Sequence, residues 1–176
     1  MTDRNVPQRS ERVVLRRLNA GDLDAFQAYR NDPEVARHQG WQAMDDTRAQ
    51  GFLRHMETAE ILLPGEWSQL ALADRNTGAL IGDVGVYLAE DETRAELGIT
   101  LSQAAQGKGL ALEALTIVCR WLWSEAPIAR IEAITSAENT RALTLLNRSP
   151  FSFTHTTHET EDGTQLTEHW FELRRS

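Results

Sequence analysis

The stretch Gln106-Gly107-Lys108-Gly109-Leu110-Ala111 follows a strand-like segment at residues 95–101 and leads into a segment at residues 110–125 that carries an apolar stripe. A loop between a strand and a helix presents unpaired backbone N–H groups and the positive end of the helix dipole. Gly107 and Gly109 let the backbone approach a ligand closely and adopt conformations closed to other residues. The stretch therefore predicts a site for a phosphate or pyrophosphate group.

Two nucleotide-binding motifs also contain glycine-rich loops, but this stretch does not match the residue pattern of either. A dinucleotide fingerprint requires a third glycine where the chain has Leu112, and a Walker loop requires serine or threonine after the lysine, where the chain has Gly109. The side chain of Lys108 either contacts a phosphate or is simply solvated, and the sequence leaves both interpretations open. The loop thus indicates an anion site of another kind.

The segments around the loop predict alternating strands and helices. Before it we expect a strand at 12–18, a helix at 21–31, a helix beginning at Asp45-Asp46, and three antiparallel strands at 67–73, 79–88 and 95–101. After it we expect a helix at 110–125, a strand at 128–135, a helix at 139–148, and a closing hairpin of strands 151–158 and 165–173. This order predicts an α/β fold with one mixed sheet in a single domain.

Length and charge limit the class of protein. The chain of 176 residues fits one domain, and its polar first ten residues predict a flexible tail at 1–10 before a domain at 11–176. No apolar stretch is long enough to cross a bilayer, so we expect a cytoplasmic protein that does not bind membranes. With 18 basic and 26 acidic residues, the net charge of −8 disfavours nucleic acid and favours a cationic partner such as an amine.

The cysteine and histidine residues give no sign of a metal site. Cys119, the single cysteine, lies in an apolar run, which favours a buried core thiol over a nucleophile. His38, His155 and His158 lack the spacing of metal ligands, and we expect them on the surface. We therefore expect no metal.

The glycine loop is similar to the Gln/Arg-x-x-Gly-x-Gly/Ala motif of the GCN5-related N-acetyltransferases, the GNAT family. Other stretches along nearly the whole chain resemble the branch that includes RimJ and RimL: Val14 to Leu18, Asn31 to Ala36, Gly78 to Gly85, Ala95 to Leu101, and Glu113-Ala114-Leu115 after the loop. The resemblance implies a single-domain, mostly antiparallel mixed sheet flanked by helices. It also implies that two splayed parallel strands, here 95–101 and 128–135, hold the cofactor.

Acetyl-CoA is the cosubstrate that this resemblance implies. The contacts carried over are the backbone of Ile99, Thr100 and Leu101 and the loop residues Gln106, Gly107, Lys108, Gly109, Leu110 and Ala111. Asn139 matches the residue that hydrogen-bonds the cofactor arm, and asparagine at this position is also a good helix cap. The two roles are compatible.

Glu96 resembles the glutamate that serves as general base in several members of the family, commonly through a water. The alternative is a solvated strand glutamate that shares a face with Thr100. The family's general acid has no counterpart here, because Leu146 stands where many members have tyrosine. Ala142 stands where the RimJ/RimL-like branch commonly has serine.

We predict transfer of acetyl from acetyl-CoA to a primary amine, either a protein N-terminal α-amine or a small amine metabolite. Two alternatives remain: an acetyltransferase for aminoglycoside-type antibiotics, and a non-catalytic acyl-CoA binding module. Trp41, Trp67 and Trp170 either wall the acceptor site or belong to the core. Exposed edge strands in the closing hairpin leave a homodimer open.

Overall fold

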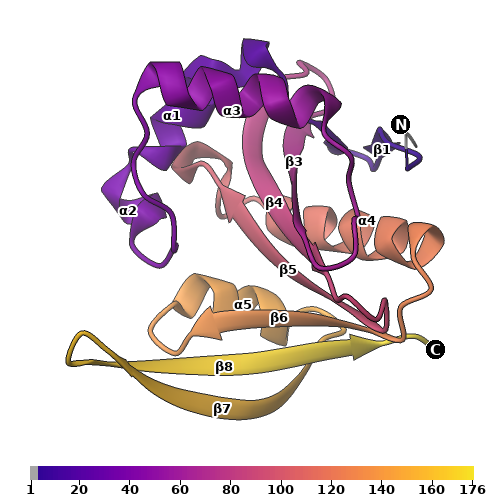
Figure 1. Cartoon of the computed structure of the whole chain (residues 1–176), viewed down its shortest axis with the longest axis vertical. Coiled ribbons are helices and arrows are strands. Elements are labelled where there is room, and N and C mark those ends of the chain that lie inside the picture. The colour runs from indigo at the N-terminus through magenta and orange to yellow at the C-terminus, as the bar shows by residue number, and fades with distance from the viewer. Residues whose placement is uncertain (1–3) are drawn as a thin grey trace.

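One sheet organises the part of the chain that the computed structural model describes, residues 4–176. Its eight strands run in the order β1-β2-β3-β4-β5-β6-β8-β7 within that range. The strands are β1 Gln8–Arg9, β2 Val13–Arg17, β3 Trp67–Asp74, β4 Leu80–Leu88, β5 Arg94–Leu101, β6 Arg130–Ser136, β7 Ser152–Glu161 and β8 Thr164–Arg174. Neighbours pair antiparallel except β5 and β6, which are parallel. The predicted mixed, mostly antiparallel sheet is confirmed (Figure 1).

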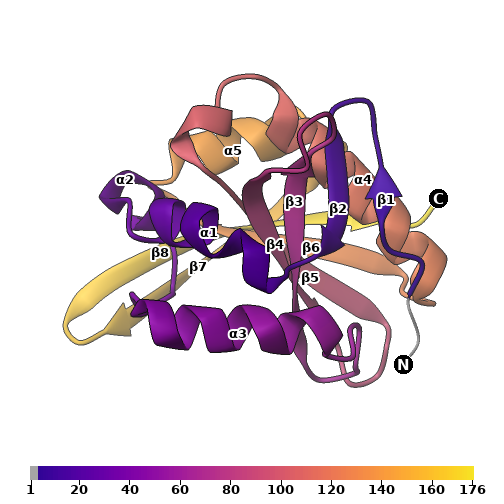
Figure 2. The same ribbon diagram turned by 90° about the horizontal axis from the view of Figure 1, so that it is seen from above.

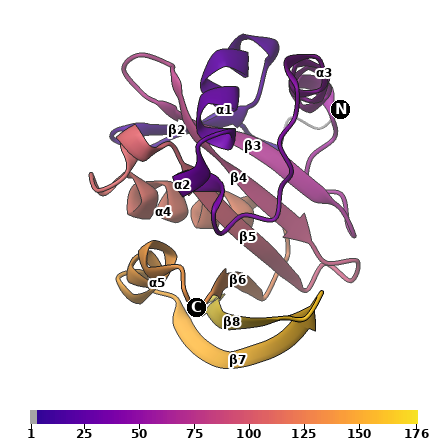
Figure 3. The ribbon, with the colours of Figure 1, turned by 90° about the vertical axis from the view of Figure 1, so that its left-hand side faces the viewer.

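Helices cover both faces of the strands β2 to β5. The helices of the described chain are α1 Leu23–Arg30, α2 Pro33–Ala36, α3 Asp46–Thr58, α4 Leu110–Glu125 and α5 Thr140–Asn147, with short 3-10 turns η1 Ala20–Asp22 and η2 Gln103–Ala105. The last of them, α5, packs against β7. Figure 3 shows α1 and α3 on one face of these strands and α4 on the other. Each face has its own apolar core, because strand side chains alternate between the two faces.

The helix boundaries follow the predicted caps. Asp45 accepts a hydrogen bond from the Arg48 N–H at 2.8 Å and so begins α3, as expected. The helix α4 begins directly after Gly109 and ends two residues before Pro127, which cannot continue it. Pro33 was expected only as a stop, yet it begins the one-turn helix α2, where a missing N–H costs nothing.

The strands β4 and β5 approach so closely at one position that only glycine fits there. A β-carbon on Gly82 would lie 2.0 Å from the carbonyl oxygen of Thr100. Gly82 also follows the register shift between Leu72 and Ala73 on the neighbouring β3. The close contact fixes how far β5 continues alongside β4 before it reaches the glycine loop.

The parallel pair β5 and β6 separates soon after it starts. Its register covers only Arg94 with Arg130, Ala95 with Ile131 and Glu96 with Glu132. Beyond Glu96, β5 stays paired with β4 up to Leu101, whereas β6 continues beside β8. Figure 3 shows β6, β8 and β7 turning away from the strands β2 to β5. The expected splay of the two parallel strands is therefore present.

Part of the segment expected to be a flexible tail, residues 1–10, contacts the rest of the fold, and residues 1–3 lie outside the described part. Val6 is buried, and the Trp121 indole N–H donates to the Arg4 carbonyl oxygen at 2.7 Å. The two residues of β1 pair with β2 at the edge of the sheet (Figure 2). A polar segment this short has no periodicity to read, so its order depends on partners distant in sequence.

A buried ion pair attaches α1 to the sheet. The Asp83 carboxylate, with its side chain 2% exposed, accepts from Arg30 at 3.1 Å, from Gln69 at 2.6 Å and from the Tyr29 hydroxyl. The Arg30 guanidinium lies between two aromatic rings, 4.6 Å from the centroid of Phe26 and 4.1 Å from that of Trp41. Every oxygen of the buried carboxylate is thereby hydrogen-bonded.

Two remaining expectations concern Cys119 and membrane association. Cys119 is buried in the core as expected, and burial raises its pKa to about 12. A thiol of that kind stays protonated at neutral pH and is a poor nucleophile. Among the helices of residues 4–176, none has the length and apolar character required to span a bilayer.

Replacing Asp83 by alanine should lower the free energy of unfolding by about 3–5 kcal/mol, because it leaves the buried Arg30 charge without its partner. Urea denaturation of the wild type and the variant measures this difference. The matched control is Glu57→Ala at an exposed position of α3, where a change within about 0.5 kcal/mol is expected. An equal effect of both substitutions would contradict the role given to Asp83.

Candidate functional site

The glycine loop has the backbone geometry that the sequence predicted. Gly107 and Gly109 adopt φ angles of +72° and +77°, in the left-handed region that side chains disfavour. Gly109 is the N-cap of α4, and no side chain caps the first N–H groups of that helix in the described part of the chain. These N–H groups point toward solvent at the positive end of a four-turn helix. An anionic group of phosphate type fits there.

Gln106 joins this loop to the end of β5 and to the first turn of α5. Its side-chain N–H donates to the Leu101 carbonyl oxygen at 3.0 Å, and its carbonyl oxygen accepts from Arg141 on α5. The carbonyl oxygen of Leu101 is thus already hydrogen-bonded within the chain. The backbone N–H groups of β5 are the groups left for a ligand. Arg141, exposed in the first turn of α5, places a positive charge beside the loop that sequence reasoning did not assign.

Arg12 and Glu113 hold the loop from its other side. The two oxygens of Glu113 accept from the Ser10 hydroxyl at 2.7 Å, the Arg12 backbone N–H at 2.6 Å and the Arg12 guanidinium at 2.8 Å. Arg12 also donates to the Lys108 carbonyl oxygen at 2.9 Å. In a trans peptide the C=O and the following N–H point in opposite directions. Arg12 therefore turns the N–H of Gly109 away from itself.

The contact with Ser10 and Arg12 lowers the pKa of the Glu113 carboxyl group. Burial alone would raise its pKa, but the hydrogen bonds from Ser10 and Arg12 and the charge of Arg12 outweigh burial and lower the pKa. Glu113 belongs to a stretch that resembles the family, yet nothing in the sequence pairs it with Arg12, 101 residues away. The contact is visible only in the folded chain.

The edge of β5 beyond Glu96 faces the space left by the departing β6. Ile99 and Leu101 turn their side chains toward the α4 core, and Thr100 turns to the opposite face, where it is buried. Their backbone groups on the β6 side have no strand partner in residues 4–176. This free edge leads directly into the glycine loop. An elongated ligand with a terminal diphosphate fits the combination of edge and loop.

Asn139 lies across that space, at the start of α5. Its side-chain oxygen accepts from the Ala142 N–H at 3.1 Å, which confirms the predicted cap. Its NH2 group donates to no atom of the described chain, so it stays available for a ligand. The cap and the predicted contact therefore use opposite ends of one amide.

Glu96 occupies the last paired position of β5 before the strands separate. Its carboxylate makes no hydrogen bond and no ion pair within residues 4–176. Burial raises the pKa of Glu96 above its usual value; Arg94 opposes this rise, and Glu132 and Glu168 add to it. An unpaired, partly desolvated carboxylate beside the free strand edge is suited to accept a proton.

The three tryptophans that the sequence assigns either to the acceptor site or to the core differ in their surroundings. Trp67 is 57% exposed and is aligned across β4 with Tyr87, which is itself aligned with Glu96. Trp170 stacks on His155 with ring centroids 5.1 Å apart and lies on the same face of the sheet as Glu96. Trp41 is half-buried over Arg30. Two of the three therefore flank Glu96 outside the core.

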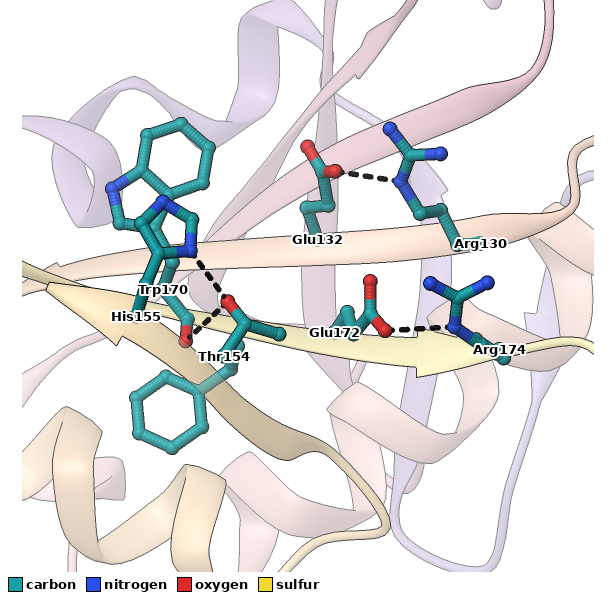
Figure 4. A pocket seen from close by; sticks show the side chains of 8 residues that line it. Arg130, Glu132, Thr154, His155, Trp170, Glu172 and Arg174 are labelled. Atoms are coloured by element: carbon teal, nitrogen blue, oxygen red, sulfur yellow. Dashed lines mark hydrogen bonds and ion pairs between the residues drawn. The ribbon is translucent and has the colours of Figure 1, made fainter.

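A cavity of about 280 Å³ lies on this face, one strand beyond Glu96. Figure 4 shows two ion pairs side by side in it, Glu132 with Arg130 and Glu172 with Arg174, and the stacked His155 and Trp170 at its other end. The pairs measure 2.8 Å and 2.7 Å. Glu132 also accepts from Arg94 at 3.1 Å. Most of the charge in this cavity is thus neutralised within the chain.

Apolar side chains in half-buried or buried surroundings occupy the two positions that resemble the family's general acid. Leu146 is buried in the core of α4 and the sheet, and Ala142 is half-buried on α5. His155 and His158 are exposed and His38 is half-buried. Across the part of the chain with assigned structure, no three histidine, cysteine or carboxylate groups come together as metal ligands.

Comparison with known proteins gives one family. Residues 12–152 match the family model described as Acetyltransferase (GNAT) domain. The chain is 29% identical, over 144 residues, to the uncharacterized N-acetyltransferase p20 of Bacillus licheniformis, and the match covers 81% of this chain and 80% of that protein.

Solved structures share the fold at low sequence identity. A GNAT-family acetyltransferase from Bacillus anthracis superposes with a TM-score of 0.82 at 17% identity, covering 94% of this chain and 96% of that one. The spermidine N-acetyltransferase from Vibrio cholerae, in complex with CoA and spermine, superposes with a TM-score of 0.76 at 18% identity and the same two coverages of 94% and 96%.

Replacing Glu113 by glutamine should lower stability at neutral pH but not at acid pH. The folded-state pKa of Glu113 is lowered, so its contribution is present above the unfolded pKa and is lost as pH falls through the folded value. A loss of about 1 kcal/mol corresponds to about 2–4 °C in melting temperature for a chain of this size. Thermal denaturation across the acid range measures it, and a pH-independent difference would contradict the charge-based explanation.

Proposed function

The chain belongs to the GNAT acetyltransferase family, and from this premise we propose that it transfers acetyl from acetyl-CoA directly to a primary amine with Glu96 as general base. The observation that carries the proposal is the position of Glu96. Its unpaired carboxylate stands where β5 and β6 separate, at the end of the free strand edge that leads to the glycine loop.

Acetyl-CoA has the shape that the edge and loop can accommodate. The backbone N–H groups at Gly107, Lys108 and Gly109 and at the start of α4 hold the pyrophosphate, with Leu110 and Ala111 forming the first turn. The free edge at Ile99, Thr100 and Leu101 binds the pantetheine arm, and the NH2 group of Asn139 approaches it from α5. Bound there, acetyl-CoA supplies an activated acyl group.

Glu96 has the properties of a base for this reaction. An amine must be neutral to attack, and a lysine-type amine has a pKa near 10.4, against about 7.7–8.0 for an α-amine. Burial raises the pKa of Glu96 and so makes it a stronger base than an ordinary carboxylate. Proton removal proceeds through Glu96, directly or through one water.

No side chain is an obvious general acid for this reaction, and the thiolate leaving group requires little help from one. A thiol has a pKa of about 8.5, so a thiolate leaves readily near neutral pH. Buried Leu146 and half-buried Ala142 provide no proton at the positions that resemble the family's acid. Catalysis in this chain thus relies on base, positioning and backbone donors.

The missing acid residues also support a second candidate, a binding module that holds acetyl-CoA without transferring its acetyl group. Both candidates predict that acetyl-CoA raises the melting temperature, since a ligand of the native state stabilises it. Only the transferase releases CoA thiol when an amine is added. Absence of any thermal shift at millimolar acetyl-CoA would reject both.

The acceptor is an amine of either a protein N-terminus or a small metabolite. Net charge of −8 and the carboxylates of Glu96 and Glu168 on one face favour a cationic acceptor. A thiol-release assay across α-amino peptides, polyamines and aminoglycosides separates these classes. Preferential turnover of aminoglycosides would favour the antibiotic-modifying alternative.

Replacing Glu96 by glutamine should reduce kcat by about 10²-fold or more, because the base is lost while the side chain keeps its shape. The acid limb of the wild-type pH profile, set by the raised pKa of Glu96, should disappear from the residual activity. The Kd for acetyl-CoA should stay unchanged. Unaltered turnover would reject Glu96 as the base.

The melting temperature of Glu96→Gln is the control for its loss of activity. The folded-state pKa of Glu96 is raised, so folding favours its neutral form, and this contribution is lost as pH rises through the folded value. Glutamine remains neutral, so the variant should melt above the wild type at pH 7 and lose this advantage at low pH. A fall in both activity and stability at neutral pH would indicate misfolding instead.

Replacing Arg12 by alanine should raise the Kd for acetyl-CoA about tenfold, because the Lys108 carbonyl is released and the Glu113 charge is left uncompensated near the phosphates. Calorimetric titration measures the change, and Arg12→Lys should restore part of the affinity. The matched control is Arg9→Ala, at an exposed position on β1 whose side chain makes no hydrogen bond or ion pair in the described chain. Equal Kd values for all of these proteins would contradict the positioning role.

A further inference from the structure

Two glycines lie opposite each other on the face of the sheet that carries Glu96. Gly85 on β4 and Gly98 on β5 are register partners, and Gly98 is two residues beyond Glu96 on the same face. A β-carbon on Gly98 would meet no atom within 4 Å. Neither position carries a side chain, and we call the pair the glycine floor of Gly85 and Gly98. Gly98 is exposed beside the gap between β5 and β6, whereas Gly85 is buried beneath neighbouring side chains.

Gln69 overhangs this floor with a fixed orientation. A β-carbon on Gly85 would lie 3.2 Å from the side-chain oxygen of Gln69. The Asp83 carboxylate already accepts from Tyr29 and Arg30, so the amide of Gln69 must turn its NH2 group to Asp83, at 2.6 Å. Its oxygen then points over the floor and accepts no hydrogen bond in the described chain. An unpaired acceptor held in this way suits a ligand N–H donor.

Trp67 closes the floor at the end away from the gap. Its ring would lie 3.4 Å from a β-carbon on Gly85, and Tyr87 supports it with ring centroids 5.6 Å apart. More than half of the Trp67 surface stays exposed. An exposed indole face supported from behind is a binding surface for an organic cation.

We propose that the glycine floor binds the acceptor, and that Gln69 and Trp67 select an amine that carries a second cationic group. This inference rests on the proposed function and specifies the acceptor for the same site. The reacting amine lies at the gap beside Glu96, the carbon chain lies on Gly98, and the second cation reaches the Gln69 oxygen and the Trp67 ring that cover Gly85. The matching chemical class is a short linear diamine or a lysine-type side chain.

The dimensions and the charge of the floor agree with this class. Adjacent strands are about 4.8 Å apart, so a chain that starts at the β5 edge crosses one strand spacing before it reaches Gly85 beneath Trp67. A short linear diamine spans that distance. Glu96, without an internal ion pair, supplies the negative field that attracts a doubly charged amine.

Kinetics with three amines test the floor: diaminobutane, butylamine with the same chain and one charge, and an alanine-initiated tripeptide with a branched α-carbon. The wild type should have the highest kcat/KM for diaminobutane. Gly98→Val, which places a branched side chain on the floor, should raise the KM of both linear amines about tenfold and leave the Kd for acetyl-CoA unchanged. Wild-type preference for the tripeptide, or unchanged KM values in Gly98→Val, would overturn the proposal.

Trp67→Ala separates the second-cation contact from the floor. It should raise the KM of diaminobutane about fivefold and leave that of butylamine unchanged, since only the diamine places a charge on the indole. Equal effects on the two amines would contradict the contact. Gly51→Ala, at an open and exposed position on α3, is the matched glycine control and should change neither constant.

The proposed function and this inference fail in different ways. A wild type that binds no acetyl-CoA, or binds it and acetylates no amine, would reject the proposed function and the acceptor floor with it. A wild type that acetylates amines with no loss in Gly98→Val would reject the floor alone.

Discussion

The early end of the ladder between β5 and β6 is the constraint on which the rest of the site depends. Parallel strands normally continue to satisfy each other's backbone groups, but here the register stops at Glu96 and Glu132. The backbone edge of β5 past that point is left for a ligand. The same separation exposes Glu96 at its apex and lets α5 approach the glycine loop from the other side. One interrupted ladder thus creates the free edge of β5, places Glu96 at the start of that edge and opens the gap beside it.

Two charge clusters, one on each face of the strands β2 to β5, hold the parts beside this gap. On the cofactor side, Glu113 and Arg12 fix the glycine loop. On the acceptor side, Asp83 binds Arg30 and Gln69 and so orients α1 and one wall of the glycine floor. Both carboxylates are hydrogen-bonded at each oxygen, which the buried Asp83 requires in a low-dielectric interior. Glu96 alone, between them, has no partner within residues 4–176, which is the condition for its proposed role as base.

Much of the fold could be predicted because its signals are local. The helix α4 begins and ends where its glycine and proline neighbours indicated, Asp45 and Asn139 cap the helices that they were expected to cap, and Cys119 lies in the core. The order of residues 4–10 could not be predicted. A two-residue strand has no periodicity, and Val6 and Arg4 are held by partners more than a hundred residues away, such as Trp121.

The sequence by itself determined the glycine loop, the order of strands and helices, and the resemblance to one family. Those properties depend on backbone angles and periodicity, which a residue shares with near neighbours. Only the tertiary structure decided that Arg12 meets Glu113, that Gln69 turns its oxygen over Gly85, and that Gly85 faces Gly98. Such contacts depend on strand register and on helix packing across long separations in sequence. They fix which groups surround the gap between β5 and β6.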